Sequence, residues 1–233
     1  MEIPQLMDAG RRLIVAHRAG NCLDELREAE RLGVDVVEAD LRLFRGRVEV
    51  RHLNTVGPIP LLWDTWKLGN PFAPRLQLED LLATVSPETN LMLDLKGINP
   101  RLARRAFEQL REHHVGKLTV CARNWRLLRP FEDQAGIRVV HSVGNRWQLR
   151  ELNRRAARGG RMLDGVSIRA SLLDKERAQA LVQRARLVMA WPVNSTEQAR
   201  KLRDWGIHGM ITDIPETIAA ALRPATRATT TKA

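Results

Sequence analysis

Several features are scarce or missing in this chain of 233 residues, and each excludes a class of protein. Its two cysteines, Cys22 and Cys121, are too few for the framework of a disulfide-rich protein. No run approaches the ~20 apolar residues that a helix needs to span a bilayer. We expect no targeting segment, because the short apolar run Leu13–Ala16 leads directly into a His-Arg pair. Together these features predict a protein of the reducing cytoplasm.

Aromatic residues are also few, at 4% with no tyrosine, whereas the chain is strongly basic, with a net charge of +11. Of its 38 basic residues, six are lysines and the remaining 32 are arginines. A positive surface attracts polyanions, anionic membranes and anionic substrates alike. The densest basic segment, Arg146–Arg161, lacks the interleaved aromatics of a nucleic-acid-binding surface, so we expect no nucleic-acid partner. A solvated helix face and peripheral contact with anionic lipid head groups both stay open for this segment.

Short apolar runs alternate with helical patterns along the chain. Strands are predicted over 13–18, 34–41, 90–96, 117–123, 137–143, 165–171, 187–194 and 209–213. Helices are predicted over 23–32, 78–85, 100–113, 125–134, 146–158, 174–186, 195–205 and 215–222. This order predicts an α/β fold, a compact single-domain (β/α)8 TIM barrel over residues 1–222. The alternative is an open doubly wound sheet, although no glycine-rich phosphate loop follows the first strand.

Two segments depart from this alternation. The stretch Arg42–Leu76 is irregular apart from a short predicted strand over 48–52, and it separates the second strand from its helix. In a barrel that connection lies at the C-terminal face, where barrel enzymes bind their substrates. Residues 223–233 contain Pro, Thr and basic residues without periodicity, so we expect a disordered basic tail.

Charged side chains concentrate where the predicted strands end. Glu38 and Asp40 are two residues apart, as are Asp94 and Lys96, so each pair points to one side of its strand, which in a barrel is the lumen. Three clustered carboxylates repel one another, and a divalent cation relieves that repulsion. An all-oxygen ligand set suits Mg²⁺ or Ca²⁺ better than zinc. With Lys96 beside it, such a cation would attract an anionic phosphate.

Two histidines also lie at predicted strand ends. His17, next to Arg18, closes the first strand, and His52 closes the short strand. Because an imidazole titrates near neutrality, a histidine on each side of a phosphate can serve as base and acid. The sequence does not show which of the two is the acid. By strand position alone, three further residues are candidates for contact with the phosphate or the head group, with a solvated or structural role as the alternative: Arg123, His141 and Arg169.

Six short motifs follow one another between residues 13 and 215. They are Ala16–Asn21, Gly33–Asp40, Val50–His52, Leu93–Lys96, Ala190–Asn194 and Trp205–Pro215. In this order they resemble the glycerophosphodiester phosphodiesterase family of the phospholipase-C-like barrel superfamily. The resemblance implies a metal-dependent enzyme of lipid metabolism that hydrolyses glycerophosphodiesters to sn-glycerol 3-phosphate and an alcohol. In that family a substrate hydroxyl beside the ester attacks phosphorus, and water then opens the cyclic intermediate.

The resemblance also implies a role for each candidate residue. The acid/base pair would be His17 and His52, and the ligands of Mg²⁺ or Ca²⁺ would be Glu38, Asp40 and Asp94. The phosphate would contact Arg18 and Lys96, and Trp191 would line the substrate pocket. The implied substrate is a small glycerophosphodiester or a lysophospholipid.

The sequence departs from the family pattern at several positions. Ala19 replaces the third residue of the opening motif, and Gly20 replaces a glutamate. Leu53 replaces the aspartate after the second histidine, so an orienting group for His52 is expected to be missing. Asp94 stands where glutamate is common in the family, and an aspartate at this position resembles the related sphingomyelinase D and lysophospholipase D enzymes. The alternatives are therefore a phosphodiesterase of that type and, in another class, a catalytically weak basic barrel that binds nucleic acid or anionic membrane.

Overall fold

The computed structural model describes residues 1, 3–56, 59–64, 67–69, 75–113, 117–160 and 162–223, with the backbone alone in 54–69 and at 158 and 159. Eight parallel strands form its centre: β1 (Leu13–Ala16), β2 (Val36–Phe44), β7 (Leu91–Leu95), β8 (Leu118–Ala122), β9 (Ile137–Val143), β10 (Gly165–Arg169), β11 (Val188–Trp191) and β12 (Gly209–Thr212). The barrel is closed because β1 pairs with both β2 and β12. The predicted (β/α)8 barrel is confirmed, and the open sheet is excluded.

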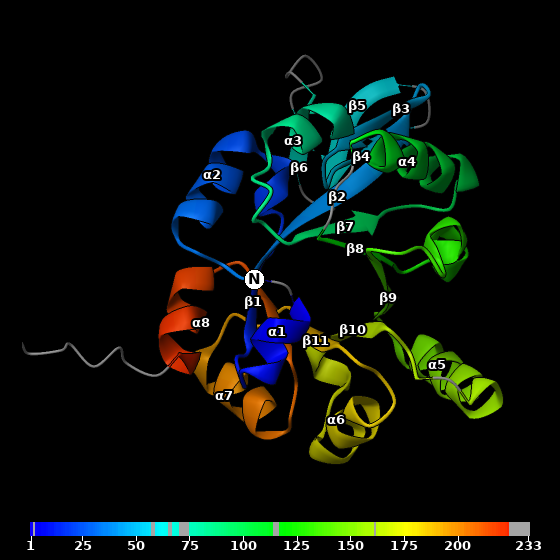
Figure 1. The fold of residues 1–233 in the computed structure, drawn as a ribbon. Coiled ribbons are helices and arrows are strands. Elements are labelled where there is room, and N and C mark those ends of the chain that lie inside the picture. Colours follow the sequence, from blue (N-terminus) through cyan, green and yellow to red (C-terminus); the bar gives the residue numbers. More distant parts are fainter. Residues whose placement is uncertain are drawn as a thin grey trace, which may run out of the picture.

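Helices surround these strands (Figure 1). The α-helices are α1 (Ile3–Asp8), α2 (Leu23–Arg31), α3 (Leu78–Thr84), α4 (Pro100–Glu112), α5 (Arg146–Gly159), α6 (Lys175–Val182), α7 (Thr196–Asp204) and α8 (Pro215–Leu222). Short 3₁₀ helices are η1 (Ala19–Asn21), η2 (Trp125–Phe131) and η3 (Ala170–Leu172). Side chains of Asn145, Asp174 and Ser195 cap the first turns of α5, α6 and α7. Within the described ranges, no helix combines the length and apolar character needed to cross a membrane.

The helices differ from the prediction in two places. The segment predicted as a helix over 125–134 forms the 3₁₀ helix η2, because Pro130 within it lacks the backbone N–H that a longer α-helix requires. Helix α1 was not predicted, since six residues are too few to show a helical period. It packs Ile3 and Leu6 against the apolar side chains inside the barrel and closes its N-terminal end.

Strand alternation divides the buried side chains into two sets. One set fills the lumen, and the larger set packs between the strands and the helices. The lumen set comprises Leu13, Val15, Val36, Met92, Cys121, Val140, Leu187, Met189 and Ile211, with Ile3 and Leu6 from α1. Because these apolar side chains fill the lower lumen, the polar residues of the same strands gather at its C-terminal end.

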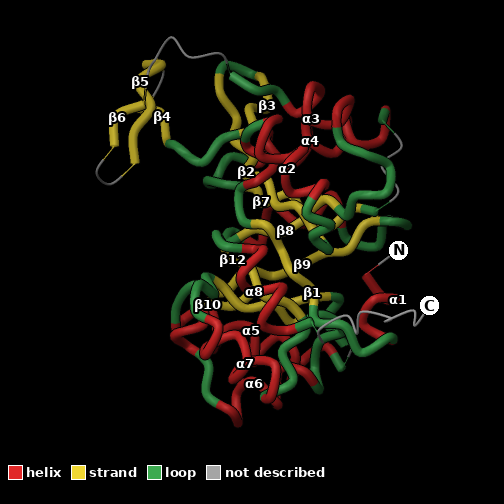
Figure 2. Tube along the Cα trace, turned by 90° about the vertical axis from the view of Figure 1, so that its left-hand side faces the viewer, coloured by secondary structure: helices red, strands yellow, loops and turns green. Residues whose placement is uncertain are grey.

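The connection between β2 and α3 is more regular than the sequence suggested. Strand β2 turns back at Arg45 and Gly46, which have φ of 48° and 81°, and pairs with the antiparallel β3 (Arg47–Val50). Three further strands, β4 (Asn54–Val56), β5 (Ile59–Asp64) and β6 (Lys67–Gly69), form a separate antiparallel sheet that stands away from the barrel (Figure 2). The return of β3 matters for the site, because Arg51 donates its backbone N–H to the Asp40 carbonyl oxygen at 2.8 Å. The next residue, His52, is thereby brought to the barrel mouth.

The expected disordered tail falls almost wholly on residues 224–233, which lie outside the described residues.

His141 lies on the outer face of β9, packed edge-to-face against Trp125 with ring centroids 5.3 Å apart. It therefore faces the helices and does not contribute to the lumen, contrary to its candidacy for phosphate contact. Its Nδ1 is buried and has no hydrogen-bond partner among the described residues. Burial, with a smaller contribution from the charge of Arg155, lowers the pKa of His141 to about 4.

We expect His141 to make the fold sensitive to acid. Because its folded pKa lies below the value of an unfolded histidine, its contribution to stability is complete above pH 6.5 and is lost as the pH falls toward 4. The loss at pH 5 should be on the order of 2 kcal/mol. Urea unfolding at pH 7 and pH 5 measures it, and His141→Gln should lose less stability over this interval than the wild type. Equal losses in the two proteins would contradict the prediction.

Candidate active site

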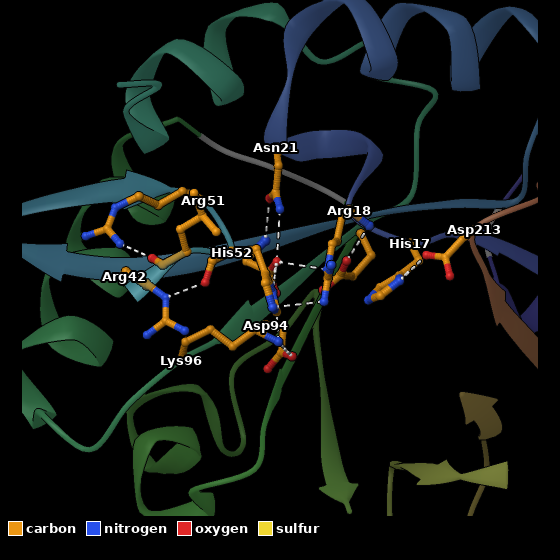
Figure 3. Close-up of polar contacts among 12 residues, drawn as sticks. His17, Arg18, Asn21, Arg42, Arg51, His52, Asp94, Lys96 and Asp213 are labelled. Atoms are coloured by element: carbon orange, nitrogen blue, oxygen red, sulfur yellow. Dashed lines mark hydrogen bonds and ion pairs between the residues drawn. The ribbon is translucent and has the colours of Figure 1, made fainter. Parts of the chain in front are cut away.

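The C-terminal ends of the barrel strands surround a cavity of about 320 Å³. Its lining includes seven of the eight predicted site residues: His17, Arg18, Glu38, His52, Asp94, Lys96 and Trp191. The eighth, Asp40, is fully buried and contacts His52 and Lys96. Residues from five parts of the chain thus converge on one site, as Figure 3 shows for its polar contacts.

Three carboxylates meet at one side of this cavity. Glu38 and Asp40 come from β2, and Asp94 comes from the neighbouring β7, where it lies in register with Asp40. One oxygen of each lies within 4.8 Å of the other two, and all three residues are buried. Burial, reinforced by the charge of Asp40, raises the pKa of Glu38 well above its usual range.

The same cluster contains the ammonium group of Lys96. Its Nζ lies 2.7 Å from Asp40 Oδ1 and also forms an ion pair with Asp94. Although burial opposes the charged form, the nearby carboxylates outweigh it and raise the pKa of Lys96 above its ordinary value. Lys96 is therefore a permanent cation at the bottom of the mouth.

The carboxylate cluster fits a divalent cation. Asp94 Oδ1 is buried and accepts no hydrogen bond from any described residue. Three carboxyl groups share the two positive charges of Lys96 and Arg18, so a negative charge on Glu38 would be uncompensated, in keeping with its raised pKa. A cation bound by Glu38, Asp40 and Asp94 would use the unpartnered oxygen and compensate this charge. The all-carboxylate donor set favours Mg²⁺ or Ca²⁺.

Arg18 occupies a left-handed backbone conformation, with φ of 61° and ψ of 5°. This conformation costs a non-glycine residue roughly 1 kcal/mol, and two contacts offset that cost. The backbone N–H of Arg18 donates to Glu38 Oε2 at 2.6 Å, and its Nη2 donates to His52 Nε2 at 2.9 Å. The turn also ends β1 at Ala16, two residues earlier than predicted.

Asn21 holds Asp40 through two hydrogen bonds, a role that sequence reasoning missed. Its Nδ2 donates to Asp40 Oδ2 at 2.9 Å, and its Oδ1 accepts from the Asp40 backbone N–H at 2.8 Å. This approach depends on Gly20, where a Cβ atom would lie only 2.7 Å from the Cβ of Ala39. The glutamate expected at position 20 from the family pattern therefore has no space against β2.

His52 does have an orienting carboxylate, so the expectation drawn from Leu53 is wrong. Nδ1 of His52 lies 3.0 Å from Asp40 Oδ2, while Nε2 accepts from Arg18. Since a guanidinium can only donate, the neutral ring carries its proton on Nδ1. Burial alone would raise the pKa of Asp40, but its hydrogen bond to His52 and the charge of Lys96 hold it well below its usual range.

His17 is oriented by a different carboxylate. Its Nδ1 lies 2.6 Å from Asp213 Oδ1, and Asn194 Nδ2 donates to the other oxygen of Asp213 at 2.6 Å. Asn194 Oδ1 in turn accepts from the Asp213 backbone N–H at 2.9 Å. Burial lowers the pKa of His17 despite the hydrogen bond to Asp213. The ring is therefore neutral near pH 7, with Nε2 as its available nitrogen.

Asp213 and Asn194 were part of the closing motifs, yet neither was predicted as a site residue. The signal was their position directly after β12 and β11, at the same end of the barrel as His17.

A comparison with family models now identifies the chain. The model of the glycerophosphoryl diester phosphodiesterase family matches residues 78–217, more than half of the sequence. The chain belongs to this family. It is a phosphoric diester hydrolase of the glycerophosphodiester phosphodiesterase type, in agreement with the motifs. The matched range contains Asp94, Lys96 and Trp191, whereas the first three motifs lie before it.

Solved structures support the fold of this phosphodiesterase. A phosphodiesterase of Oleispira antarctica, in complex with the product sn-glycerol-3-phosphate, is 20% identical with a TM-score of 0.70, covering 90% of this chain and 96% of that chain. The glycerophosphodiester phosphodiesterase of Thermotoga maritima is 18% identical with a TM-score of 0.71, covering 90% and 98%. That of Parabacteroides distasonis is 17% identical with a TM-score of 0.67, covering 91% and 96%. No curated protein matches the chain.

Of the remaining candidate residues for substrate contact, two line the cavity and one does not. Trp191 and Arg123 line the cavity of the phosphodiesterase, at the ends of β11 and β8. Arg169, at the end of β10, is exposed and does not line it.

We expect Gly20→Ala to disable the phosphodiesterase without unfolding it. The added methyl group would push η1 away from Ala39 and separate Asn21 from Asp40. Loss of such a supporting contact typically lowers activity about 10–100-fold. Hydrolysis of glycerophosphocholine measures the effect, with the melting temperature as a test of folding.

A double variant provides the matched control. Gly20→Ala combined with Ala39→Gly removes the 2.7 Å contact and should recover most of the activity. An inactive double variant, or a fully active single one, would contradict this account of Gly20.

Proposed function

We propose that the protein hydrolyses glycerophosphodiesters to sn-glycerol 3-phosphate and an alcohol, with a divalent cation and with His17 and His52 as the acid/base pair. The supporting observation is that two carboxylate-oriented histidines share one cavity with the three-carboxylate cluster. The product named for the Oleispira antarctica structure agrees with this substrate class.

Arg18 and Lys96 would bind the phosphate, since both present positive charge to the cavity. Arg18 contacts His52 in the absence of substrate, and an incoming phosphate would compete for this guanidinium. Glu38, Asp40 and Asp94 would hold the divalent cation, which supplies further positive charge against the phosphate oxygens.

The different surroundings of the two histidines support a different proposed role for each. His17 has a pKa lowered by burial and an available Nε2, so it would take the proton from the substrate hydroxyl beside the ester. The hydroxyl oxygen then bonds to phosphorus while the ester bond to the leaving alcohol breaks. His52 in its protonated form would protonate that leaving oxygen from Nε2, while Asp40 holds Nδ1. Water opens the cyclic phosphate with the two roles reversed.

We expect His17→Ala and His52→Ala each to lower kcat about 10²–10⁴-fold. Phosphorus NMR of glycerophosphocholine hydrolysis, with Mg²⁺ or Ca²⁺ and with excess chelator, measures both this loss and the need for a cation. His113→Ala is the matched control, since His113 is exposed at the end of α4. Activity that survives chelation, or a wild type that hydrolyses no glycerophosphodiester with either ion, would refute the proposal.

One observation favours lysophospholipids as a second substrate class. Three exposed apolar side chains follow barrel strands at the mouth: Ile98 after β7, Trp147 after β9 and Ile214 after β12, with exposed fractions of 84%, 66% and 39%. Exposed arginines at 146 and 150 flank Trp147. Apolar and aromatic side chains beside basic ones suit an anionic membrane surface. Peripheral docking there would present a membrane lysophospholipid to the cavity.

Trp147→Ser should lower the amount of protein that co-sediments with phosphatidylcholine–phosphatidylserine vesicles several-fold. The reason is that an indole buried at a lipid interface contributes strongly to membrane binding. Met162→Ser is the control, since Met162 is 46% exposed but precedes β10 at the opposite end of the barrel. Equal vesicle binding by the wild type and both variants would exclude docking through Trp147.

A further inference from the structure

The cavity wall formed by β8 to β11, which begins beside the carboxylate cluster, carries hydrogen-bond donors. Ser142 from β9, Ser167 from β10 and Trp191 from β11 line this wall with Arg123. Trp191 Nε1 is buried and has no hydrogen-bond partner among the described residues, and the two buried serines line the cavity beside it. An unpartnered buried donor is costly, so the indole N–H of Trp191 in a cavity with two serines points to a ligand that carries hydrogen-bond acceptors.

Arg123 is the only charged residue on this wall in the described part of the chain. Unlike Arg18 and Lys96, its guanidinium forms no ion pair with a described carboxylate. Register places Arg123 next to Lys96, one strand farther round the barrel, because Ala122 pairs with Leu95. The charge of Arg123 is therefore available to a bound anion.

Gly144 and Gln148 hold the Arg123 side chain in place. It packs on Gly144, where a Cβ atom would lie 2.8 Å from Arg123 Nη2 and 2.9 Å from Cζ. The buried Gln148 joins the two residues, since its Oε1 accepts from the Gly144 N–H at 2.8 Å and its Nε2 donates to the Arg123 carbonyl at 2.9 Å. An arginine positioned in this way loses little entropy on binding a ligand.

We propose that Arg123 recognises a second anionic group on the substrate, a carboxylate on the head group, and so determines specificity. This proposal rests on the proposed function. The reacting phosphate would have Arg18, Lys96 and a cation bound by the carboxylates, whereas a head group that extends along the β8–β11 wall would meet Arg123 and the two serines. A guanidinium matches a carboxylate through two parallel hydrogen bonds. The substrate class is thus a glycerophosphodiester whose alcohol carries a carboxylate.

Two substrates that differ only by a carboxylate test this directly: sn-glycero-3-phosphoserine and sn-glycero-3-phosphoethanolamine. The wild type should prefer the serine compound in kcat/KM by about tenfold, the effect of one charge-assisted hydrogen bond at a partly exposed site. Arg123→Gln should remove this preference mainly through KM, and Arg123→Lys should restore part of it. Gly144→Ala should reduce it without removing the charge, because the methyl group displaces the guanidinium. Arg126→Gln, an exposed arginine outside the cavity, is the control.

The outcomes separate this proposal from the proposed function. If Arg123→Gln lowers kcat/KM equally for both substrates, Arg123 serves the reacting phosphate and the proposal is overturned, as it is if neither value changes. Calorimetric binding of the same two compounds to His17→Ala tests recognition without turnover. Tighter binding of the serine compound that depends on Arg123 supports the proposal even if hydrolysis fails. Equal binding of both compounds overturns it.

Discussion

The mouth of this barrel depends on keeping the Asp40 carboxylate ionised where no water reaches it. Burial penalises the charge, and only a complete set of partners compensates for it. Asn21 and His52 contact one oxygen of Asp40, and Lys96 contacts the other. Each partner is in turn positioned by a local feature: the turn into η1 for Asn21, the return of β3 for His52, and the alternation of β7 for Lys96. The carboxylate therefore connects three segments that are distant in the sequence.

This constraint explains the geometry around Gly20 and Arg18. Asn21 reaches Asp40 only if η1 lies against β2, and the absence of a side chain at position 20 allows that approach. The left-handed Arg18 begins the same turn and directs its N–H to Glu38. The left-handed backbone conformation of Arg18 costs free energy. It persists because it arranges charged groups that would otherwise repel one another.

The two sides of the cavity are electrostatically unequal. On the β2–β7 side, carboxylates and cations are interleaved and nearly compensate one another. On the β8–β11 side, Arg123 has no ion-pair partner and Trp191 Nε1 no hydrogen-bond partner among the described residues. The two histidines also differ in their partners. His52 contacts Asp40 of the carboxylate cluster, whereas His17 contacts Asp213, which follows the last strand of the barrel. The charged groups of the cavity are thus unevenly distributed between its two sides.

The sequence by itself determined the barrel and the convergence of the carboxylates. Strand and helix periods are local, and two-residue spacing places Glu38 with Asp40 and Asp94 with Lys96 on one side of any strand. The sequence did not predict contacts that join distant segments. Because Leu53 follows His52, the sequence predicted that His52 lacks an orienting carboxylate. In the structure Asp40, from another strand, orients it. His141 and Arg123 looked equivalent at strand ends, but the tertiary structure turns one toward the helices and the other into the cavity. The pairing of His17 with Asp213, 196 residues away, arises only when β12 closes the barrel against β1, because closure alone brings the chain's two ends together.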